Sequence, residues 1–232
     1  MAEARTTLIT GAASGIGAAT ARRQRERGDR LVLAGRRERP LTGLAAELGD
    51  DVLVKTCDVA EWDQVEDLAA AAIERFGAID VVFANAGFGA SRGFLEESPE
   101  HWRSMVLTNV LGVAYTIRAT LPHLLARGHG HFVITSSVAG RRALPGSLYS
   151  ATKWAATAIG EALRQELRQM RDDDRIKVTL IEPGMVETPF FDSPPTGVLE
   201  AGDIAAAVDY ATSQPDRVDV NEILIRPVSQ PT

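Results

Sequence analysis

Short apolar runs rich in β-branched residues alternate with longer helical patterns along the whole chain, and this alternation constrains the fold more than any other feature. The apolar runs lack a polar residue at every second position, which is typical of strands buried on both faces. Strands that alternate with helices form a parallel sheet through right-handed crossovers. We therefore predict an α/β fold: a single doubly wound Rossmann-type domain with a seven-stranded parallel sheet and helices on both faces. The predicted strands cover 6–10, 31–34, 52–56, 79–84, 132–135, 176–181 and 222–225, and the predicted helices 16–27, 41–48, 62–76, 99–126, 150–170 and 204–213.

The chain carries no stretch of glycine, serine and proline long enough to separate two domains, so residues 1–232 are predicted to form one domain. Pro194, Pro195 and Gly197 break any regular pattern within 189–202, which predicts a short and mostly irregular flap. A short flap favours an open pocket and a bulky or varied substrate. The apolar residues of this segment would either form a lid or pack the flap down: Phe190, Phe191, Val198 and Leu199.

The composition fits a protein with one sizeable core: 45% of the residues are hydrophobic and 24% are charged. The formal net charge of −6 argues against nucleic acid and anionic membrane surfaces as partners. No apolar run approaches the roughly 20 residues that a membrane helix needs, and residues 1–5 lack the apolar core of a signal peptide. We therefore expect a cytoplasmic protein.

The metal-binding and disulfide-forming residue types are few and badly spaced. Cys57 is the single cysteine, so an intrachain disulfide and a multi-cysteine metal site are excluded. The four histidines never show the His-x-x-x-His spacing of a helical zinc pair. His129 and His131 flank Gly130 at the start of a predicted strand, which indicates a structural or solvated role. No metal site is expected.

A glycine-rich turn, Thr10–Gly17, connects the first predicted strand with the first predicted helix. Its G-x-x-x-G-x-G spacing also fits a plain tight turn, but the position between strand and helix favours a phosphate cradle. Glycines let the backbone approach a pyrophosphate, whose charge the helix N-terminus stabilises. The residues of this turn predicted to bind a dinucleotide are Gly11, Ser14, Gly15, Ile16 and Gly17.

The end of the second strand indicates which nicotinamide cofactor is preferred. An acidic residue there binds a ribose 2′-hydroxyl, whereas arginine accommodates a 2′-phosphate. Here Gly35 is followed by Arg36 and Arg37, which favours NADP(H) over NAD(H). The two arginines would equally suit a solvated turn, and Glu38 remains an alternative partner for the ribose.

Tyr149 and Lys153 stand four positions apart at the start of a predicted helix, so they share one face. A free tyrosine titrates near pH 10 and is a poor base at neutral pH. We expect the Lys153 ammonium and a cationic nicotinamide to lower the phenol pKa. A drop of about 3 units would need roughly 4 kcal/mol. The same spacing occurs by chance in many helices, so this pair alone does not identify a site.

Further polar residues follow the ends of other predicted strands, where α/β proteins bind their ligands. Ser137 lies 12 positions before Tyr149 and would hydrogen-bond a substrate carbonyl or alkoxide, with Ser136 as a weaker candidate. Asn85, Ala86 and Gly87 follow the fourth strand. Asn109 lies within a long helical pattern, where it would also fit a buried amide bonded to backbone.

Taken together and in this order, these motifs resemble the short-chain dehydrogenase/reductase family over essentially the whole chain. The resemblance implies a dinucleotide-binding oxidoreductase with Tyr149 as general acid/base and Lys153 lowering its pKa and holding the nicotinamide ribose. It implies Ser137 as the carbonyl polariser and Asn109 as the holder of a water in a proton relay. The matching residues are Thr10–Gly17, Asp58, Val59, Asn85, Ala86, Gly87, Asn109, Ser137, Tyr149, Lys153, Pro183 and Gly184.

The resemblance also implies how the rest of the cofactor is held. Asp58, followed by Val59, would contact the adenine, and the segment from Asn85 through Ala86 to Gly87 would line the path to the nicotinamide. The nicotinamide cradle would consist of Pro183, Gly184, Val186 and Thr188. The sequence departs from the family at Ala84, where many members have asparagine, and in the Ser137–Tyr149 spacing, which is one residue shorter than in many members.

We expect an NADP(H)-dependent oxidoreductase that interconverts a secondary alcohol and a ketone or aldehyde. The C-terminal run Val220–Pro227 resembles a subgroup that acts on 3-hydroxy acids. Arg141 or Arg142 would bind the carboxylate of such a substrate; alternatively, both arginines are simply exposed. The alternatives are an NAD-dependent alcohol dehydrogenase and a catalytically silent nucleotide sensor or scaffold. Relatives assemble through the helices after the fourth and fifth strands, which implies a homotetramer or homodimer.

Overall fold

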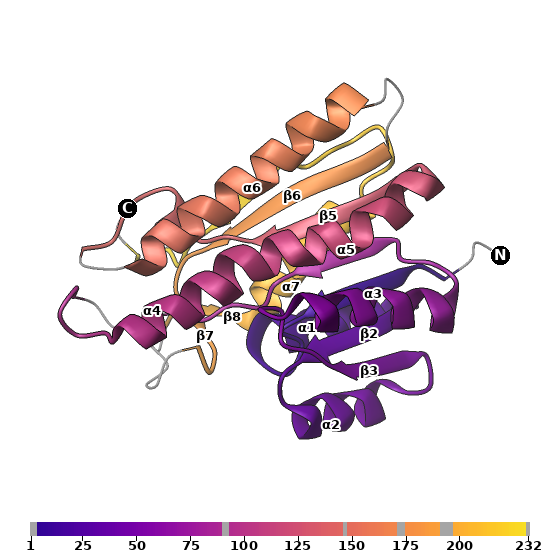
Figure 1. The fold of residues 1–232 in the computed structure, drawn as a ribbon, viewed down its shortest axis with the longest axis horizontal. Coiled ribbons are helices and arrows are strands. Elements are labelled where there is room, and N and C mark those ends of the chain that lie inside the picture. Colours follow the sequence, from indigo (N-terminus) through magenta and orange to yellow (C-terminus); the bar gives the residue numbers. More distant parts are fainter. Residues whose placement is uncertain (1–3, 90–92, 146–147, 171–174, 191–196, 231–232) are drawn as a thin grey trace.

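The computed structural model describes residues 4–89, 93–145, 148–170, 175–190 and 197–230. Seven parallel strands form one sheet, as predicted (Figure 1), and their order in the sheet is β3-β2-β1-β4-β5-β6-β9. The order reverses direction between β1 and β4, and the carboxyl ends of these two strands define a topological switch point, where such sheets bind ligands. The strands are β1 (Thr6–Thr10), β2 (Arg30–Gly35), β3 (Val52–Thr56), β4 (Val81–Ala84), β5 (His129–Thr135), β6 (Arg175–Pro183) and β9 (Glu222–Ile225).

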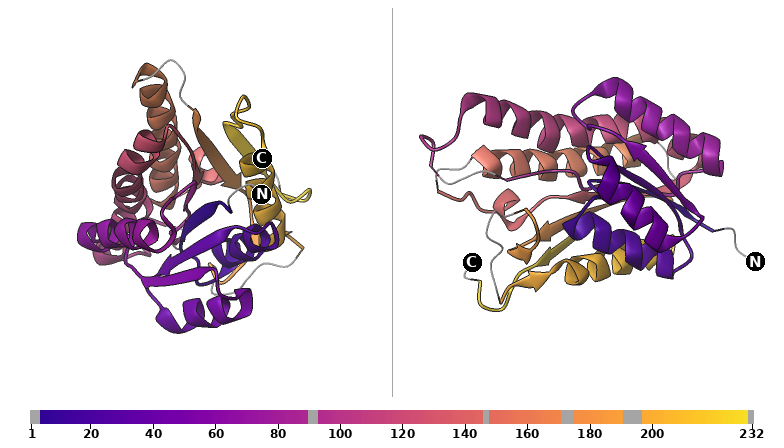
Figure 2. Two further views of the ribbon diagram at one scale, coloured as in Figure 1. Left: turned by 90° about the vertical axis from the view of Figure 1, so that its right-hand side faces the viewer. Right: turned by 90° about the horizontal axis from the view of Figure 1, so that it is seen from below.

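Helices cover both faces of the sheet, so the domain is doubly wound (Figure 2). One face carries α3, α5 and α6, and the other carries α1, α2 and α7. No helix within the described ranges is both long enough and apolar enough to cross a membrane. The α-helices are α1 (Gly15–Glu26), α2 (Glu38–Leu48), α3 (Trp62–Phe76), α4 (Pro99–Val106), α5 (Gly112–Arg127), α6 (Leu148–Met170) and α7 (Ala201–Ser213).

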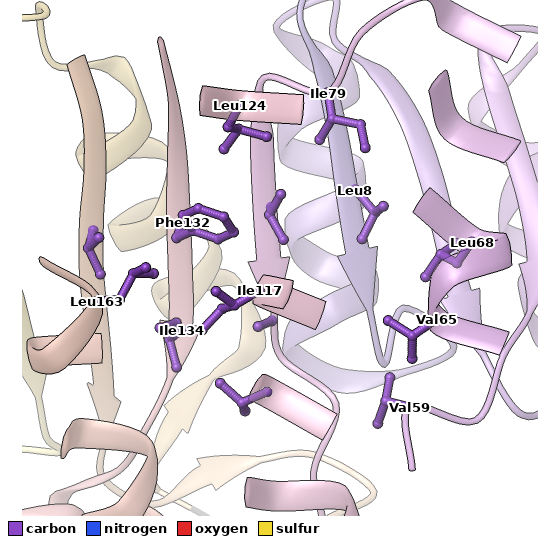
Figure 3. Packing of buried hydrophobic residues seen from close by; sticks show 14 of the residues in the cluster. Leu8, Val59, Val65, Leu68, Ile79, Ile117, Leu124, Phe132, Ile134 and Leu163 are labelled. Atoms are coloured by element: carbon purple, nitrogen blue, oxygen red, sulfur yellow. The ribbon is translucent and has the colours of Figure 1, made fainter. Parts of the chain in front are cut away.

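Two hydrophobic clusters lie on opposite faces of the sheet because successive strand residues point to opposite sides. Leu8 and Phe132 point toward α3, α5 and α6, where they meet residues such as Ile117 (Figure 3). Their chain neighbours Ile9 and Val133 point to the other face and belong to the cluster that includes residues of α1, α2 and α7. This double burial explains why the strands show no alternation of polar and apolar residues.

The long helical stretch predicted over 99–126 consists of three pieces that follow one another without a break. Between α4 and α5, residues Leu107–Leu111 form a turn of π-helix. Such turns are rare and occur frequently at functional sites. This one ends immediately before Gly112 and carries Asn109.

Several strand boundaries differ from the prediction because polar residues begin strands that apolar patterning alone cannot recognise. β5 starts at His129, and its first three residues pair with Arg175–Lys177 of β6. β4 begins later than predicted, at Val81 instead of residue 79. Ile79 is fully buried, but its N–H donates to His123 Nε2 (3.1 Å) and not to a neighbouring strand.

A second, two-stranded sheet lies at the substrate side of the domain, formed by β7 (Val186–Glu187) and β8 (Leu199–Glu200). This pairing joins the residues just before the predicted flap to residues near its end. Residues 201–202 of the flap form the first turn of α7. The middle of the flap, 191–196, lies outside the described residues and includes Phe191, Pro194 and Pro195.

Candidate active site

A cavity of about 410 Å³ opens at the carboxyl ends of the strands, around the switch point between β1 and β4. Fourteen of the residues predicted for the site line it: Gly11, Ser14, Gly15, Ile16, Asn85, Ala86, Gly87, Ser137, Tyr149, Lys153, Pro183, Gly184, Val186 and Thr188. The fold therefore gathers into one cavity residues that are spread over most of the chain.

The glycine-rich turn packs closely against the end of β4. A Cβ at Gly17 would lie 2.3 Å from the carbonyl oxygen of Gly11, so only glycine lets α1 start this close to the turn. Asn85 Nδ2 donates to the Thr10 carbonyl (3.1 Å), and Thr10 Oγ1 accepts from the Asn85 N–H (3.0 Å). The Ser14 side chain makes no capping bond to α1. The first N–H groups of α1 are thus left for another acceptor, as an anion site requires.

Ser137, Tyr149 and Lys153 meet at the opposite wall of the cavity. The Ser137 hydroxyl hydrogen-bonds the Tyr149 phenol, and Lys153 Nζ lies 5.7 Å from the centre of the Tyr149 ring. Lys153 Nζ donates to the Thr135 carbonyl (2.9 Å). Ser136 also lines the cavity, but its hydroxyl is engaged within the protein: it donates to the Lys153 carbonyl (3.0 Å) and lies 2.7 Å from Thr157 Oγ1. The geometry therefore favours Ser137 over Ser136 as the group that would hold a carbonyl oxygen.

Burial controls the protonation of this pair. It raises the pKa of Tyr149 to about 12, although the hydrogen bond with Ser137 acts in the opposite direction. Burial also lowers the pKa of Lys153 to about 8. Desolvation thus outweighs the Ser137 hydrogen bond, and the lowering expected from Lys153 together with a cationic nicotinamide stays a prediction. At neutral pH the phenol is protonated, which suits a proton donor.

Asn109 is fully buried in the π-turn and holds the chain beside Gly87. Its Oδ1 accepts from the Phe88 N–H (3.0 Å), and its Nδ2 donates to the Phe88 carbonyl (2.9 Å) and to Thr152 Oγ1 (3.1 Å). A Cβ at Gly87 would lie 3.1 Å from Asn109 Oδ1 and 3.6 Å from Lys153 Nζ. Gly87 therefore keeps open the space between these two groups.

The predicted contacts for the adenosine half lie outside the cavity lining. Arg36 and Arg37 are exposed after the end of β2, and a Cβ at Gly35 would come no closer than 3.7 Å to another atom, so there is room for a ligand. Asp58 is half-buried, and its Oδ1 accepts from the Ala60 N–H (3.0 Å). Val59 is buried against Gly112 and points into the core.

Arg141 forms ion pairs within the protein, so it is not the partner of a substrate carboxylate that the sequence suggested. Its Nε donates to Glu182 Oε1 (2.7 Å), and its terminal nitrogen pairs with Glu222. These two bonds raise its pKa. Arg142 is exposed on the surface next to it.

Some of the residues that complete the cavity were not predicted as site residues. The Phe190 ring, predicted only as lid or packing, lies edge-on to the Tyr149 ring with centroids 5.6 Å apart. Gln230, five residues past the last strand, also lines the cavity. Nothing in the local pattern around it distinguishes this glutamine. The other missed lining residues include Phe88, Gly89, Thr135, Val138, Leu144, Met185 and Pro189.

Comparison with known proteins places this arrangement in a family. Residues 5–196 match the model of the short chain dehydrogenases. The chain belongs to this family. An uncharacterized oxidoreductase of Staphylococcus epidermidis is 39% identical over 225 residues, which cover 95% of this chain and 96% of the relative. The protein is therefore an oxidoreductase of the short-chain dehydrogenase type.

Solved structures of similar proteins share the whole fold. The alcohol dehydrogenase of Thermococcus sibiricus in complex with 5-hydroxy-NADP has a TM-score of 0.90 and 34% identity, with 99% of both chains covered. A closed form of serine dehydrogenase with NADP+ has a TM-score of 0.89 and 30% identity, covering 98% of this chain and 96% of that one. A short chain dehydrogenase/reductase of Burkholderia phymatum with NAD has a TM-score of 0.87 and 30% identity, covering 96% and 89%. Similar proteins thus bind NADP or NAD.

Proposed function

We propose that this short-chain dehydrogenase interconverts a secondary alcohol and a ketone or aldehyde by hydride transfer with NADP(H). The observation that carries the proposal is the convergence of Ser137, Tyr149 and Lys153 on one cavity that also contains the glycine-rich turn. Two hydroxyls next to a buried ammonium suit a carbonyl oxygen that becomes an alkoxide.

The cavity fits a dinucleotide on structural grounds. The backbone around Gly17 is packed so tightly that a side chain would collide with Gly11, and the start of α1 lacks a side-chain cap. The turn and Asn85 would hold the pyrophosphate side, and Pro183 to Thr188 the nicotinamide side. When bound, the nicotinamide supplies or accepts the hydride.

The residues of the chain handle the substrate oxygen and its proton. In reduction, the Ser137 and Tyr149 hydroxyls hold the carbonyl oxygen, and the Tyr149 phenol donates its proton as negative charge develops there. Lys153, which is largely protonated at pH 7 with a pKa of about 8, stabilises the phenolate that remains. Asn109 Oδ1 keeps a second lone pair for a water beside Gly87, through which Lys153 would exchange its proton with solvent. In oxidation the same groups work in reverse.

The preference for NADP(H) rests on Arg36. This exposed arginine follows Gly35 at the end of β2, and a guanidinium there pairs with a ribose 2′-phosphate. We expect Arg36→Ala to raise the KM for NADPH by about tenfold or more, as loss of a charge-assisted pair implies, and the KM for NADH by less than twofold. Arg118→Ala removes an equally exposed arginine on α5 and serves as the matched control. An unchanged KM for NADPH in Arg36→Ala would refute the assignment.

A further inference from the structure

The C-terminal segment folds back over the candidate nicotinamide loop and reaches the cavity with Gln230. The Gln230 N–H donates to the Pro227 carbonyl (3.0 Å), which forms a turn after β9. Its Oε1 accepts from the Met185 N–H (2.8 Å). The side chain is therefore held at the cavity wall through its oxygen.

Gly184 lets this contact form. A Cβ at Gly184 would lie 2.3 Å from Gln230 Oε1 and 3.1 Å from Pro227 Cδ, so any larger residue would displace the C-terminal segment. The Gly184 N–H also donates to the Ile225 carbonyl (2.7 Å). The loop after β6 and the segment after β9 thus fit flush against each other.

The same loop contacts the candidate catalytic serine. The Pro183 carbonyl accepts from Ser137 Oγ (3.3 Å), and Met185, two residues further on, is bonded to Gln230. Gln230 therefore joins the cavity from the side of Ser137, where it lies well placed for the part of a substrate beyond its reacting carbonyl. Its Nε2 makes no hydrogen bond to any described residue, so both N–H groups are available to a ligand.

The charge of the cavity limits what this amide would bind. Among the described lining residues Lys153 is the only cation; it is 4% exposed and already donates to Thr135. Arg141 is paired with two glutamates. Much of the rest of the substrate wall is apolar and includes Phe88, Leu144, Met185 and Phe190. A carboxylate would lose its hydration there without gaining a free positive partner, which is costly.

We propose that Gln230 is a specificity-determining residue whose amide N–H donates to a second, neutral oxygen of the substrate. The substrate class is therefore a neutral carbonyl compound with an additional acceptor oxygen, such as a keto ester, rather than the keto form of a 3-hydroxy acid. This inference rests on the proposed reductase function.

The test compares kcat/KM with NADPH for ethyl 3-oxobutanoate, 3-oxobutanoate and 2-hexanone in four proteins: wild type, Gln230→Glu, Gln230→Met and Gln169→Glu. Gln230→Glu keeps the oxygen that accepts from Met185 but loses the N–H groups, whereas Gln230→Met loses both. Gln169→Glu makes the same change on the exposed end of α6. Melting temperatures and NADPH fluorescence titrations identify variants that are damaged in folding or cofactor binding.

We expect the wild type to prefer the ester over both other compounds. The ester-to-hexanone ratio of kcat/KM falls about tenfold in Gln230→Glu, the effect of one neutral hydrogen bond, and stays unchanged in Gln169→Glu. The role of Gln230 is overturned if the ester-to-hexanone ratio is unchanged in Gln230→Glu, or if the wild type prefers 3-oxobutanoate. In either case, turnover of 2-hexanone by the wild type would still support the proposed function. If NADPH binds but the wild type reduces none of the three, the proposed function fails and the inference fails with it.

Discussion

The buried ammonium of Lys153 gives the protein a measurable dependence of stability on pH. Its side chain is 4% exposed, and burial lowers its pKa from an ordinary value of 10.5 to about 8. Lys153→Met removes the titrating group but keeps an unbranched side chain of similar length. The variant also leaves the Thr135 carbonyl without its donor, a loss that does not depend on pH.

The sign follows from the protons bound in each state. Below pH 8 Lys153 is protonated in both the folded and the unfolded protein, and the folded state bears the full cost of burying the charge. Between pH 8 and 10.5 the folded protein has released this proton but the unfolded chain has not, so the free energy of unfolding rises with pH. With pKa values of about 8 and 10.5, the rise from pH 7 to about pH 9.5 amounts to about 2 kcal/mol.

Urea unfolding at pH 7, 8, 9 and about 9.5 measures this term in both proteins. The free energy of unfolding of the wild type, minus that of Lys153→Met, should increase by about 2 kcal/mol over this range. Tyr149 is present in both proteins, and its raised pKa affects stability mainly above pH 10, so it cancels from the difference. If the two stabilities run parallel with pH, Lys153 does not carry a buried charge and the site argument based on its desolvation is refuted.

Two further predictions concern glycines. Gly17→Ala forces a Cβ to within 2.3 Å of the Gly11 carbonyl oxygen, so we expect the free energy of unfolding in urea to fall by about 1–3 kcal/mol and NADPH to bind more weakly in a fluorescence titration. The control is Gly43→Ala, at a helical site with open space around it, which should raise the free energy of unfolding by about 0.4–1 kcal/mol. Equal effects of the two substitutions would contradict the close packing at the turn. Gly89→Ala places a Cβ 2.7 Å from the Phe190 ring, so this ring must rotate away from Tyr149. We expect the KM for an apolar ketone to rise severalfold and the free energy of unfolding to change by less than about 0.5 kcal/mol. An unchanged KM would show that this ring does not border the substrate.

The architecture was predictable because its signals are local. Strands such as Thr6–Thr10 and Val52–Thr56 are short runs of apolar and β-branched residues without regular polar alternation, so each element is recognisable by itself. Strand boundaries were mispredicted where a buried polar residue is stabilised by a partner that is distant in the sequence. His131 is an example, because its Nε2 lies 2.7 Å from Thr179 Oγ1 inside the sheet. Burial there lowers the His131 pKa to about 3, so the ring is neutral, and no pattern along the chain reveals this.

The site was predictable as a set of residues but not as an electrostatic environment. The resemblance to a family selects Ser137, Tyr149 and Lys153, and the cavity gathers them. Their pKa values depend on which atoms exclude water, and that depends on the packing of the whole domain. The same holds for Arg141, because Glu222 reaches it only through the place of β9 next to β6 at the sheet edge.

The π-turn at Leu107–Leu111 has a consequence for how such a chain can change over time. A π-turn spans one more residue than an α-turn, so the removal of a single residue within it would let α4 and α5 merge into one regular helix without altering which side of α5 meets the sheet. The core would survive, and the cradle for the dinucleotide would remain in place. Asn109 would lose its hold on Phe88. We therefore expect such a deletion to impair the proton relay proposed for Asn109 while the glycine-rich turn of the candidate nucleotide site stays in place.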